Sequence, residues 1–267
     1  MSRITSFEIN APHAAAPRKV WVYLPGNYAV GEKFPVIYMQ DGQNLFYDNL
    51  SKSRVSWRVA ETMDELYHNR NLAAIVAGVE NSELREKEYI PWKAKKKLFG
   101  GEGDVNRGEE YAGFLAKILK PYIDKNFKTD ASPEANAVAG SELGSLITLF
   151  TAMKYNDVFG AAGLFSPAAR TDERKFAKFF RETALRRAPS LYIYCGGKED
   201  ESDPQESSVE TAKLSAKIAS ERGMPVRLIL DSGGFGHESR WGVEFGGFVE
   251  YFLERAALRQ RENFSGI

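Results

Sequence analysis

The stretch AGSELGS, Ala139–Ser145, joins a short apolar run to an amphipathic segment. The apolar run, Ala135–Ala139, has the length of a buried strand, and the segment Leu143–Lys154 has the spacing of a helix. A glycine stands two residues before Glu142 and another two residues after it, so the chain can bend tightly there. These residues predict a strand, a sharp turn and a helix, with Glu142 at the apex of the turn.

Strand-like and helix-like segments alternate through most of the chain. Short β-rich apolar runs predict strands at Val20–Leu24, Pro35–Met39, Leu72–Val79, Ala135–Ala139, Ala161–Phe165, Leu191–Cys195 and Val226–Leu230. Helical periodicity predicts helices at Trp57–His68, Glu109–Asp124, Leu143–Lys154, Glu173–Leu185, Ser208–Ser220 and Trp241–Leu258. We therefore predict an α/β fold with a mostly parallel sheet of about eight strands and helices on both faces, in which the early strands can be antiparallel.

Composition limits the function classes. The 267 residues are 43% hydrophobic, which suits one α/β domain over residues 1–267. Lys plus Arg and Asp plus Glu are both 36, so no net field recruits nucleic acid or an anionic membrane. The basic run Lys93–Lys97 reads as a solvated loop, and the lone Cys195 reads as a buried strand residue that cannot form an intrachain disulfide.

Targeting and ligand-binding segments can also be read from the chain. The first residues lack the apolar core of a signal peptide, and no apolar run is long enough to cross a bilayer, so we expect a soluble cytoplasmic protein.

The connection from about residue 80 to residue 108 has no clear periodicity, and long connections of this kind commonly form an active-site wall. In open α/β sheets ligands bind beyond the carboxyl ends of the strands.

Five segments at the ends of predicted strands carry a family resemblance. They are YMQDGQNLF (Tyr38–Phe46), NSELREKEYIPW (Asn81–Trp92), AGSELGS (Ala139–Ser145), CGGKE (Cys195–Glu199) and GGFGHESRW (Gly233–Trp241). In this order they resemble the putative esterase family of the α/β-hydrolase superfamily, which includes esterase D and enterochelin-esterase-like proteins. The resemblance implies an α/β-hydrolase fold and a serine hydrolase of carbohydrate, siderophore or small acyl esters, with no cofactor and no metal.

The resemblance also assigns catalytic positions, and two of them are altered. Glu142 stands where the family's Gly-x-Ser-x-Gly turn has its serine, and Glu199 matches the acid, with the adjacent Asp200 as an alternative. The pattern Gly-Gly-x-His-x-Glu-x-x-Trp, laid on Gly233–Trp241, puts Gly236 at the histidine position and displaces His237 by one residue. The other histidines, His13 and His68, are expected at the surface.

The resemblance further implies the pocket walls. The oxyanion hole is expected from the backbone amides of Leu143 and of Gly42 or Gln43. Ligand-binding candidates, for which local packing is the alternative role, are Trp57, Tyr89, Trp92, Glu238 and Trp241. Arg85 and Glu88 are expected to brace the loop around them.

Three functions fit these residues. The first is a pseudoenzyme that binds a small molecule, such as a carbohydrate or an acyl ester, because both proton-transfer positions are changed. The second is a hydrolase of an ester or glycoside with altered chemistry, in which Glu142 acts as nucleophile or base beside Glu199, His237 or Glu238. The third is a variant of an active esterase that has lost turnover. The oligomeric state stays open.

Overall fold

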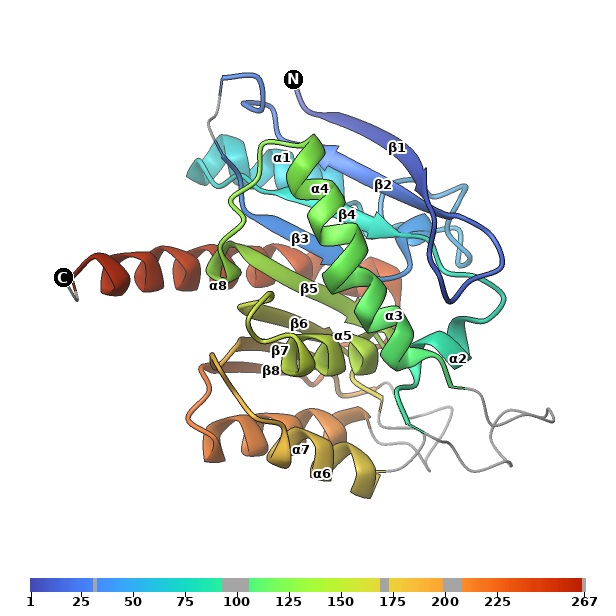
Figure 1. Cartoon of the computed structure of the whole chain (residues 1–267), viewed down its shortest axis with the longest axis vertical. Helices are drawn as coiled ribbons and strands as arrows, with labels where there is room; N and C mark the ends of the chain where they lie inside the picture. Colours follow the sequence, from blue (N-terminus) through green and yellow to red (C-terminus); the bar gives the residue numbers. More distant parts are fainter. Residues whose placement is uncertain (31–32, 93–105, 169–172, 199–207, 266–267) are drawn as a thin grey trace.

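One eight-stranded sheet forms the centre of the molecule (Figure 1). The computed structural model describes residues 1–30, 33–92, 106–168, 173–198 and 208–265. Within these ranges the strand order is β1-β2-β4-β3-β5-β6-β7-β8. The strands are β1 (Arg3–Ile9), β2 (Arg18–Leu24), β3 (Val36–Met39), β4 (Ile75–Val79), β5 (Asn136–Ser141), β6 (Ala161–Phe165), β7 (Ser190–Gly196) and β8 (Val226–Asp231).

The sheet is parallel from β4 through β3 to β8, and antiparallel at its N-terminal edge. β2 runs antiparallel to both β1 and β4, whereas β3 runs parallel to β4 and β5. The predictions of a mostly parallel sheet and of antiparallel early strands are confirmed. β1 is absent from the predicted strands because it is an edge strand with half-exposed or exposed side chains, so its sequence carries no apolar run.

Helices cover both faces of the sheet (Figure 1). The α-helices are α1 (Val59–Arg70), α2 (Arg85–Tyr89), α3 (Gly108–Phe114), α4 (Lys120–Asn126), α5 (Leu143–Lys154), α6 (Glu173–Glu182), α7 (Ser208–Glu221) and α8 (Glu238–Ser265). Short elements are the 3₁₀ turns η1 (Gly42–Asn44) and η3 (Pro133–Ala135) and the π turn η2 (Leu115–Leu119), which joins α3 to α4. The predicted helix over residues 109–124 is therefore one continuous helical stretch that contains a π turn.

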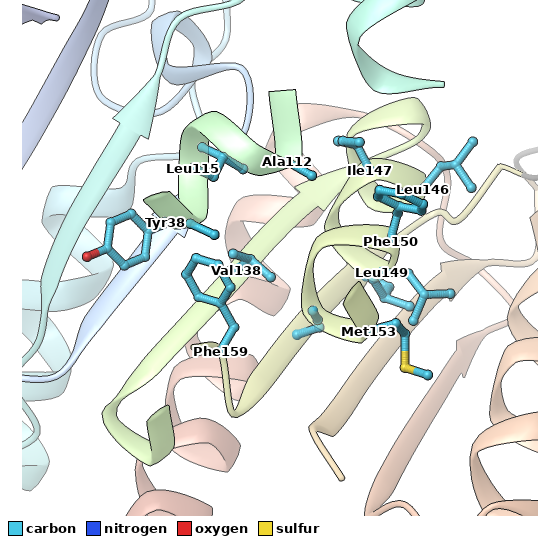
Figure 2. Close-up of a cluster of buried hydrophobic side chains, with 14 of the residues drawn as sticks. Tyr38, Ala112, Leu115, Val138, Leu146, Ile147, Leu149, Phe150, Met153 and Phe159 are labelled. Atoms are coloured by element: carbon cyan, nitrogen blue, oxygen red, sulfur yellow. The ribbon is translucent and has the colours of Figure 1, made fainter. Parts of the chain in front are cut away.

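The two faces hold separate hydrophobic cores. Helices α3, α5, α6 and α7 pack on one face, and α1 and α8 pack on the other. All residues of α5 except Lys154 are buried, as its sequence LGSLITLFTAMK requires, because that helix is apolar nearly all round. Figure 2 shows its apolar side chains packed over β5, with α3 beside them. Cys195 is fully buried in β7, as predicted.

Candidate functional site

The turn at Glu142 has the strained geometry that the flanking glycines suggest. Glu142 has φ 51° and ψ −120°, a region that residues with a Cβ atom rarely adopt, and it stands between the last residue of β5 and the first of α5. Its amide donates to the carbonyl of Phe165 in β6 at 3.0 Å. Its carbonyl accepts from the amide and the hydroxyl of Ser145 at 3.0 and 2.8 Å. The surroundings therefore hold the turn from both sides.

The two glycines of the turn allow β5 and α5 to pack closely. A Cβ atom at Gly140 would lie 2.7 Å from the Cγ of Gln40 and 2.7 Å from the carbonyl oxygen of Gly144. A Cβ atom at Gly144 would lie 3.3 Å from the Cβ of Gln40. Gly140 therefore cannot carry a side chain unless the backbone moves, which explains the spacing around Glu142.

A polar cleft of about 790 Å³ opens beside this turn. It lies where β3, β4 and β5 end, as the rule for open α/β sheets predicts. Its walls come from the segments after β3 and β4, the Glu142 turn and the start of α8. The lining residues are Asp41, Gln43, Asn44, Leu50, Lys52, Ser53, Asn81, Ser82, Glu83, Arg85, Glu86, Ser141, Glu142, Gly236, Glu238 and Trp241.

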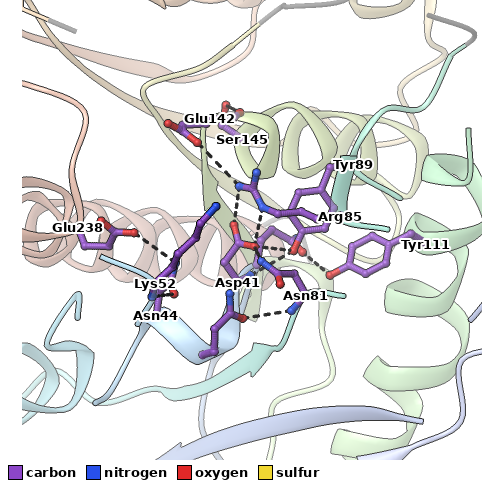
Figure 3. Close-up of polar contacts among 12 residues, drawn as sticks. Asp41, Asn44, Lys52, Asn81, Arg85, Tyr89, Tyr111, Glu142, Ser145 and Glu238 are labelled. Atoms are coloured by element: carbon purple, nitrogen blue, oxygen red, sulfur yellow. Dashed lines mark hydrogen bonds and ion pairs between the residues drawn. The ribbon is translucent and has the colours of Figure 1, made fainter. Parts of the chain in front are cut away.

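Asp41 is the centre of a hydrogen-bond network at the floor of the cleft (Figure 3). Its carboxylate accepts two bonds from Arg85, from Nε and Nη2, both at 2.8 Å, and one from the Nδ2 of Asn81 at 2.6 Å. The hydroxyl of Tyr89 donates to the same carboxylate at 3.2 Å and accepts from the Asp41 amide. Asp41 and Asn81 are absent from the sequence-predicted site, although each stands two residues after the end of a predicted strand.

Burial and charge set the protonation of this network. Burial lowers the pKa of the Arg85 guanidinium, but the adjacent Asp41 charge and its hydrogen bonds outweigh that effect and raise the pKa above its ordinary value. Burial, reinforced by the Asp41 charge, raises the pKa of Tyr89 well above its usual range. Tyr89 therefore stays a neutral donor, and Arg85 stays a cation.

The carboxylate of Glu142 lies at the edge of this network without joining it. Its Oε2 is 4.0 Å from Nη2 of Arg85, and 45% of its side chain is exposed. Among the described residues no hydrogen bond reaches this carboxylate. Both oxygens of Glu142 are consequently open to the cleft and available as acceptors.

The predicted oxyanion donors lie around the same turn. Gly42 packs against β4, where an added Cβ atom would lie 2.4 Å from the carbonyl oxygen of Gly78. The side chain of Gln43 accepts from the amide of Asn81 at 3.1 Å. The backbone amides of Gln43 and of Leu143, the first residue of α5, find no acceptor within the described part of the chain. These two amides are the candidate oxyanion donors.

His237 caps a helix and does not line the cleft. Its Nδ1 accepts from the amide of Ser239 at 3.2 Å and lies 3.0 Å from the Ser239 hydroxyl, and α8 starts at the next residue. The cleft wall is formed instead by Gly236, the residue that the family pattern puts at the histidine position. The sequence contains three histidines, and none lines the cleft.

The surface position expected for His13 is wrong, whereas His68 is exposed as expected. The His13 side chain is 3% exposed and lies beside the fully buried Glu88, which accepts from Arg18 and from Ser82. Burial, together with the positive charges of Arg18 and Arg107, lowers the pKa of His13 to about 4. His13 therefore supports α2 from behind as a neutral side chain. The expected bracing role of Glu88 fits these contacts.

Of the two carboxylates expected to partner Glu142, Glu238 lies within the described residues and Glu199 does not. Glu238 lines the cleft with 12% of its side chain exposed, and its Oε1 accepts from the Nδ2 of Asn44 at 3.2 Å. Glu199 and the basic run at Lys93–Lys97 lie outside the described residues.

The predicted aromatic ligand-binding residues do not converge on the cleft. Trp241 lines it, but Trp241 is 4% exposed and its Nε1 donates to Ser166 at 2.7 Å. Trp57 packs against Trp241 at a ring distance of 5.6 Å and lines a second cavity of about 770 Å³ between α1 and α8. Trp92 lies away from the cleft, against two phenylalanines of α6, and Tyr89 is fully buried under Asp41. The packing alternative explains Trp57 and Trp92, since ring contacts occupy their faces.

The described residues show neither a metal-binding cluster nor a membrane-spanning helix. No group of three or more His, Cys, Asp or Glu side chains is arranged to hold a metal ion there. Among the described helices, none combines the length and the apolar character needed to cross a lipid bilayer.

Comparisons with known proteins agree with the fold. The uncharacterized protein YbbA of Bacillus subtilis (strain 168) is 30% identical over 161 residues, so the match spans 58% of this chain and 58% of that relative. The enterobactin esterase FES of Shigella flexneri has a TM-score of 0.70 at 14% identity, over 95% of this chain and 58% of its own.

A third similar structure is the ferulic acid esterase AmCE1/Fae1A of Anaeromyces mucronatus, with a TM-score of 0.66 at 17% identity over 93% of this chain and 89% of its own. At such identities these two structures establish the fold alone. The family model described as "Putative esterase" matches residues 13–240, which is most of the chain. The chain therefore belongs to the putative esterase family and has the α/β-hydrolase fold.

Proposed function

We propose that this chain is a ligand-binding member of the esterase family that does not hydrolyse esters by the serine mechanism. The observation that carries the proposal is the pair of changes on one cleft. Glu142 occupies the apex of the nucleophile turn, and Gly236 lines the wall where the family pattern has its histidine. Both changes fall on the two groups that exchange the proton in a serine hydrolase.

The chemistry that a serine would perform has no substitute in this arrangement. A serine attacks an ester only when a base takes its proton, and the same base later activates water. Nδ1 of His237 accepts a hydrogen bond from the Ser239 amide at 3.2 Å, at the start of α8. A carboxylate at Glu142 also brings negative charge next to the amides that would otherwise stabilise an oxyanion.

The cleft itself is retained, which supports binding as the function. It has a volume of about 790 Å³, within the range of small-molecule sites, and its floor is ordered by the bidentate pair of Arg85 and Asp41. Similar folds occur in proteins named as enterobactin esterase and ferulic acid esterase. A carbohydrate or a small acyl ester is therefore the proposed class of ligand.

Restoring the family residues tests this proposal. The unmodified chain should not hydrolyse short aryl esters, whereas the double variant Glu142→Ser with Gly236→His should acquire a measurable rate. Each single variant serves as a control and should stay inactive, because the serine and its base act as a unit. Ester hydrolysis by the unmodified chain, with loss of that activity in Glu142→Gln, would refute the proposal.

A second candidate is a hydrolase that uses carboxylates, and one observation favours it. Glu142 and Glu238 line the same cleft, and paired carboxylates perform acid, base or nucleophile roles in glycoside cleavage. This candidate predicts turnover of an aryl glycoside or ester that disappears in Glu142→Gln and in Glu238→Gln. A covalent adduct on Glu142, seen by mass spectrometry, would identify it as the nucleophile.

A further inference from the structure

The charge of the cleft indicates what kind of ligand it accepts. Its described lining contains five carboxylates and two cationic side chains, an excess of three negative charges. Glu83, Glu86 and Lys52 are the exposed charged residues of this lining, so salt screens their charges, and Figure 3 shows the Lys52 side chain extending between Glu238 and Arg85. The less exposed charges of the cleft come from Asp41, Arg85, Glu142 and Glu238.

Arg85 does not neutralise Glu142, because the Arg85 guanidinium already forms an ion pair with Asp41. Two of its nitrogens bind the carboxylate of Asp41 at 2.8 Å in a bidentate geometry. The remaining approach to Glu142 is a 4.0 Å separation, which is longer than a hydrogen bond. Arg85 and Asp41 thus form a neutral pair, and Glu142 keeps an uncompensated charge next to that pair.

Glu238 adds a second carboxylate to the inner wall. Its Oε1 accepts one bond from the neutral amide of Asn44 at 3.2 Å, which leaves its charge in place. It is the first residue of α8, and its Oε2 lies 3.9 Å from Nε2 of His237. In Figure 3 Glu142 and Glu238 approach the network around Asp41 and Asn44 from different elements. The cleft therefore presents two anionic acceptors, and among its described lining residues the exposed Lys52 is the cation outside an ion pair.

We propose that the cleft selects ligands that carry a positively charged amino group, with Glu142 as the counter-ion and Glu238 as a second acceptor. The inference rests on the proposed ligand-binding function of the same cleft and narrows its carbohydrate or acyl ligands to those that carry an amino group. A carboxylate ligand would meet like charges at Glu142 and Glu238, which disfavours it. A neutral ligand would leave the charge of Glu142 uncompensated.

Three phenols of similar size and different charge test this inference. Tyramine is a cation, 4-ethylphenol is neutral, and 3-(4-hydroxyphenyl)propionate is an anion at pH 7. Isothermal titration should show tyramine binding at least about 10-fold more tightly than the other two, the ratio expected for one charge-assisted contact in a half-exposed site. Glu142→Gln should weaken tyramine about 10-fold and leave 4-ethylphenol unchanged.

Glu86→Gln is the matched control. Glu86 lies at the exposed rim of the same cleft, so the same change of charge should alter tyramine affinity less than twofold at 0.15 M salt. Melting temperatures of both variants verify that the fold is intact. The inference is overturned if tyramine does not bind at millimolar concentration. It is also overturned if tyramine binds no better than the neutral or the anionic phenol.

The outcomes separate this inference from the proposed function. Tight binding of the anionic phenol without ester hydrolysis would overturn the charge preference and leave a ligand-binding protein. Preference for tyramine together with ester hydrolysis by the unmodified chain would overturn the proposed function and leave the charge preference standing.

Discussion

Replacing Glu142 by glycine should stabilise the protein, whereas glycine usually destabilises. Glu142 has φ 51° and ψ −120°, and such a conformation costs a residue with a Cβ atom about 1–3 kcal/mol. Glycine adopts it without strain but loses about 0.5–1 kcal/mol more conformational entropy on folding. The difference is a net gain of about 0–2.5 kcal/mol in the free energy of unfolding.

Glu142→Ala is the matched comparison, because it removes the same carboxylate and keeps the Cβ atom. The carboxylate contributes little to stability, since it is 45% exposed and 4.0 Å from Arg85, so alanine should change the free energy of unfolding by less than about 1 kcal/mol. Urea unfolding of both variants, fitted with a common slope, measures the glycine-minus-alanine difference directly.

The sign of that difference shows whether residue 142 has a positive φ. At an ordinary backbone position the alanine variant would be the more stable of the two by about 0.5–1 kcal/mol. A Glu142→Gly protein that is less stable than Glu142→Ala would therefore refute the positive-φ turn and, with it, the assignment of Glu142 to the nucleophile position.

The remaining predictions concern the support behind the cleft. His13 has a pKa of about 4 in the folded chain and about 6.5 when unfolded, so below pH 6.5 the unfolded chain binds the proton that the folded chain refuses. The stabilising contribution of neutral His13 is complete above pH 6.5 and falls as the pH drops toward 4. Urea unfolding should therefore show a free energy of unfolding about 2 kcal/mol lower at pH 5 than at pH 7.5, a loss that is absent in His13→Gln. An equal loss in both proteins would contradict the burial of His13. Gly42→Ala should lower the free energy of unfolding by about 1–3 kcal/mol, since its Cβ atom would lie 2.4 Å from the carbonyl oxygen of Gly78, and an unchanged melting temperature would show that this approach is looser in solution.

Much of the fold could be predicted from local sequence. The turn at Glu142 is visible because strand, glycines and helix are contiguous, and α5 begins and ends at the predicted residues. β1 could not be predicted because an edge strand buries little surface. The short helix α2 lies inside the predicted long loop, and a helix of five residues has too few turns to show a period.

The cleft could be predicted only in part. The displacement of the histidine to position 237 follows from spacing between anchors in the sequence, and Gly236 lines the cleft as that alignment expects. The sequence left binding and local packing both open for Trp57 and Trp92, because their contacts with other rings depend on distant elements. The surface position expected for His13 is wrong for the same reason, because its contacts with Glu88 and Arg18 join segments far apart in the chain.

The sequence by itself determined the family, the alternation of strands and helices, and the presence of Glu142 at the apex of a glycine-flanked turn, because these properties reside in contiguous residues. Only the tertiary structure decided that Arg85 is neutralised by Asp41 and that Gly236 shares a cleft with Glu142, because these contacts depend on where segments far apart in the chain meet in space. The carboxylate of Glu142 is not neutralised for the same reason, because its nearest described cation, Arg85, is already bound to Asp41.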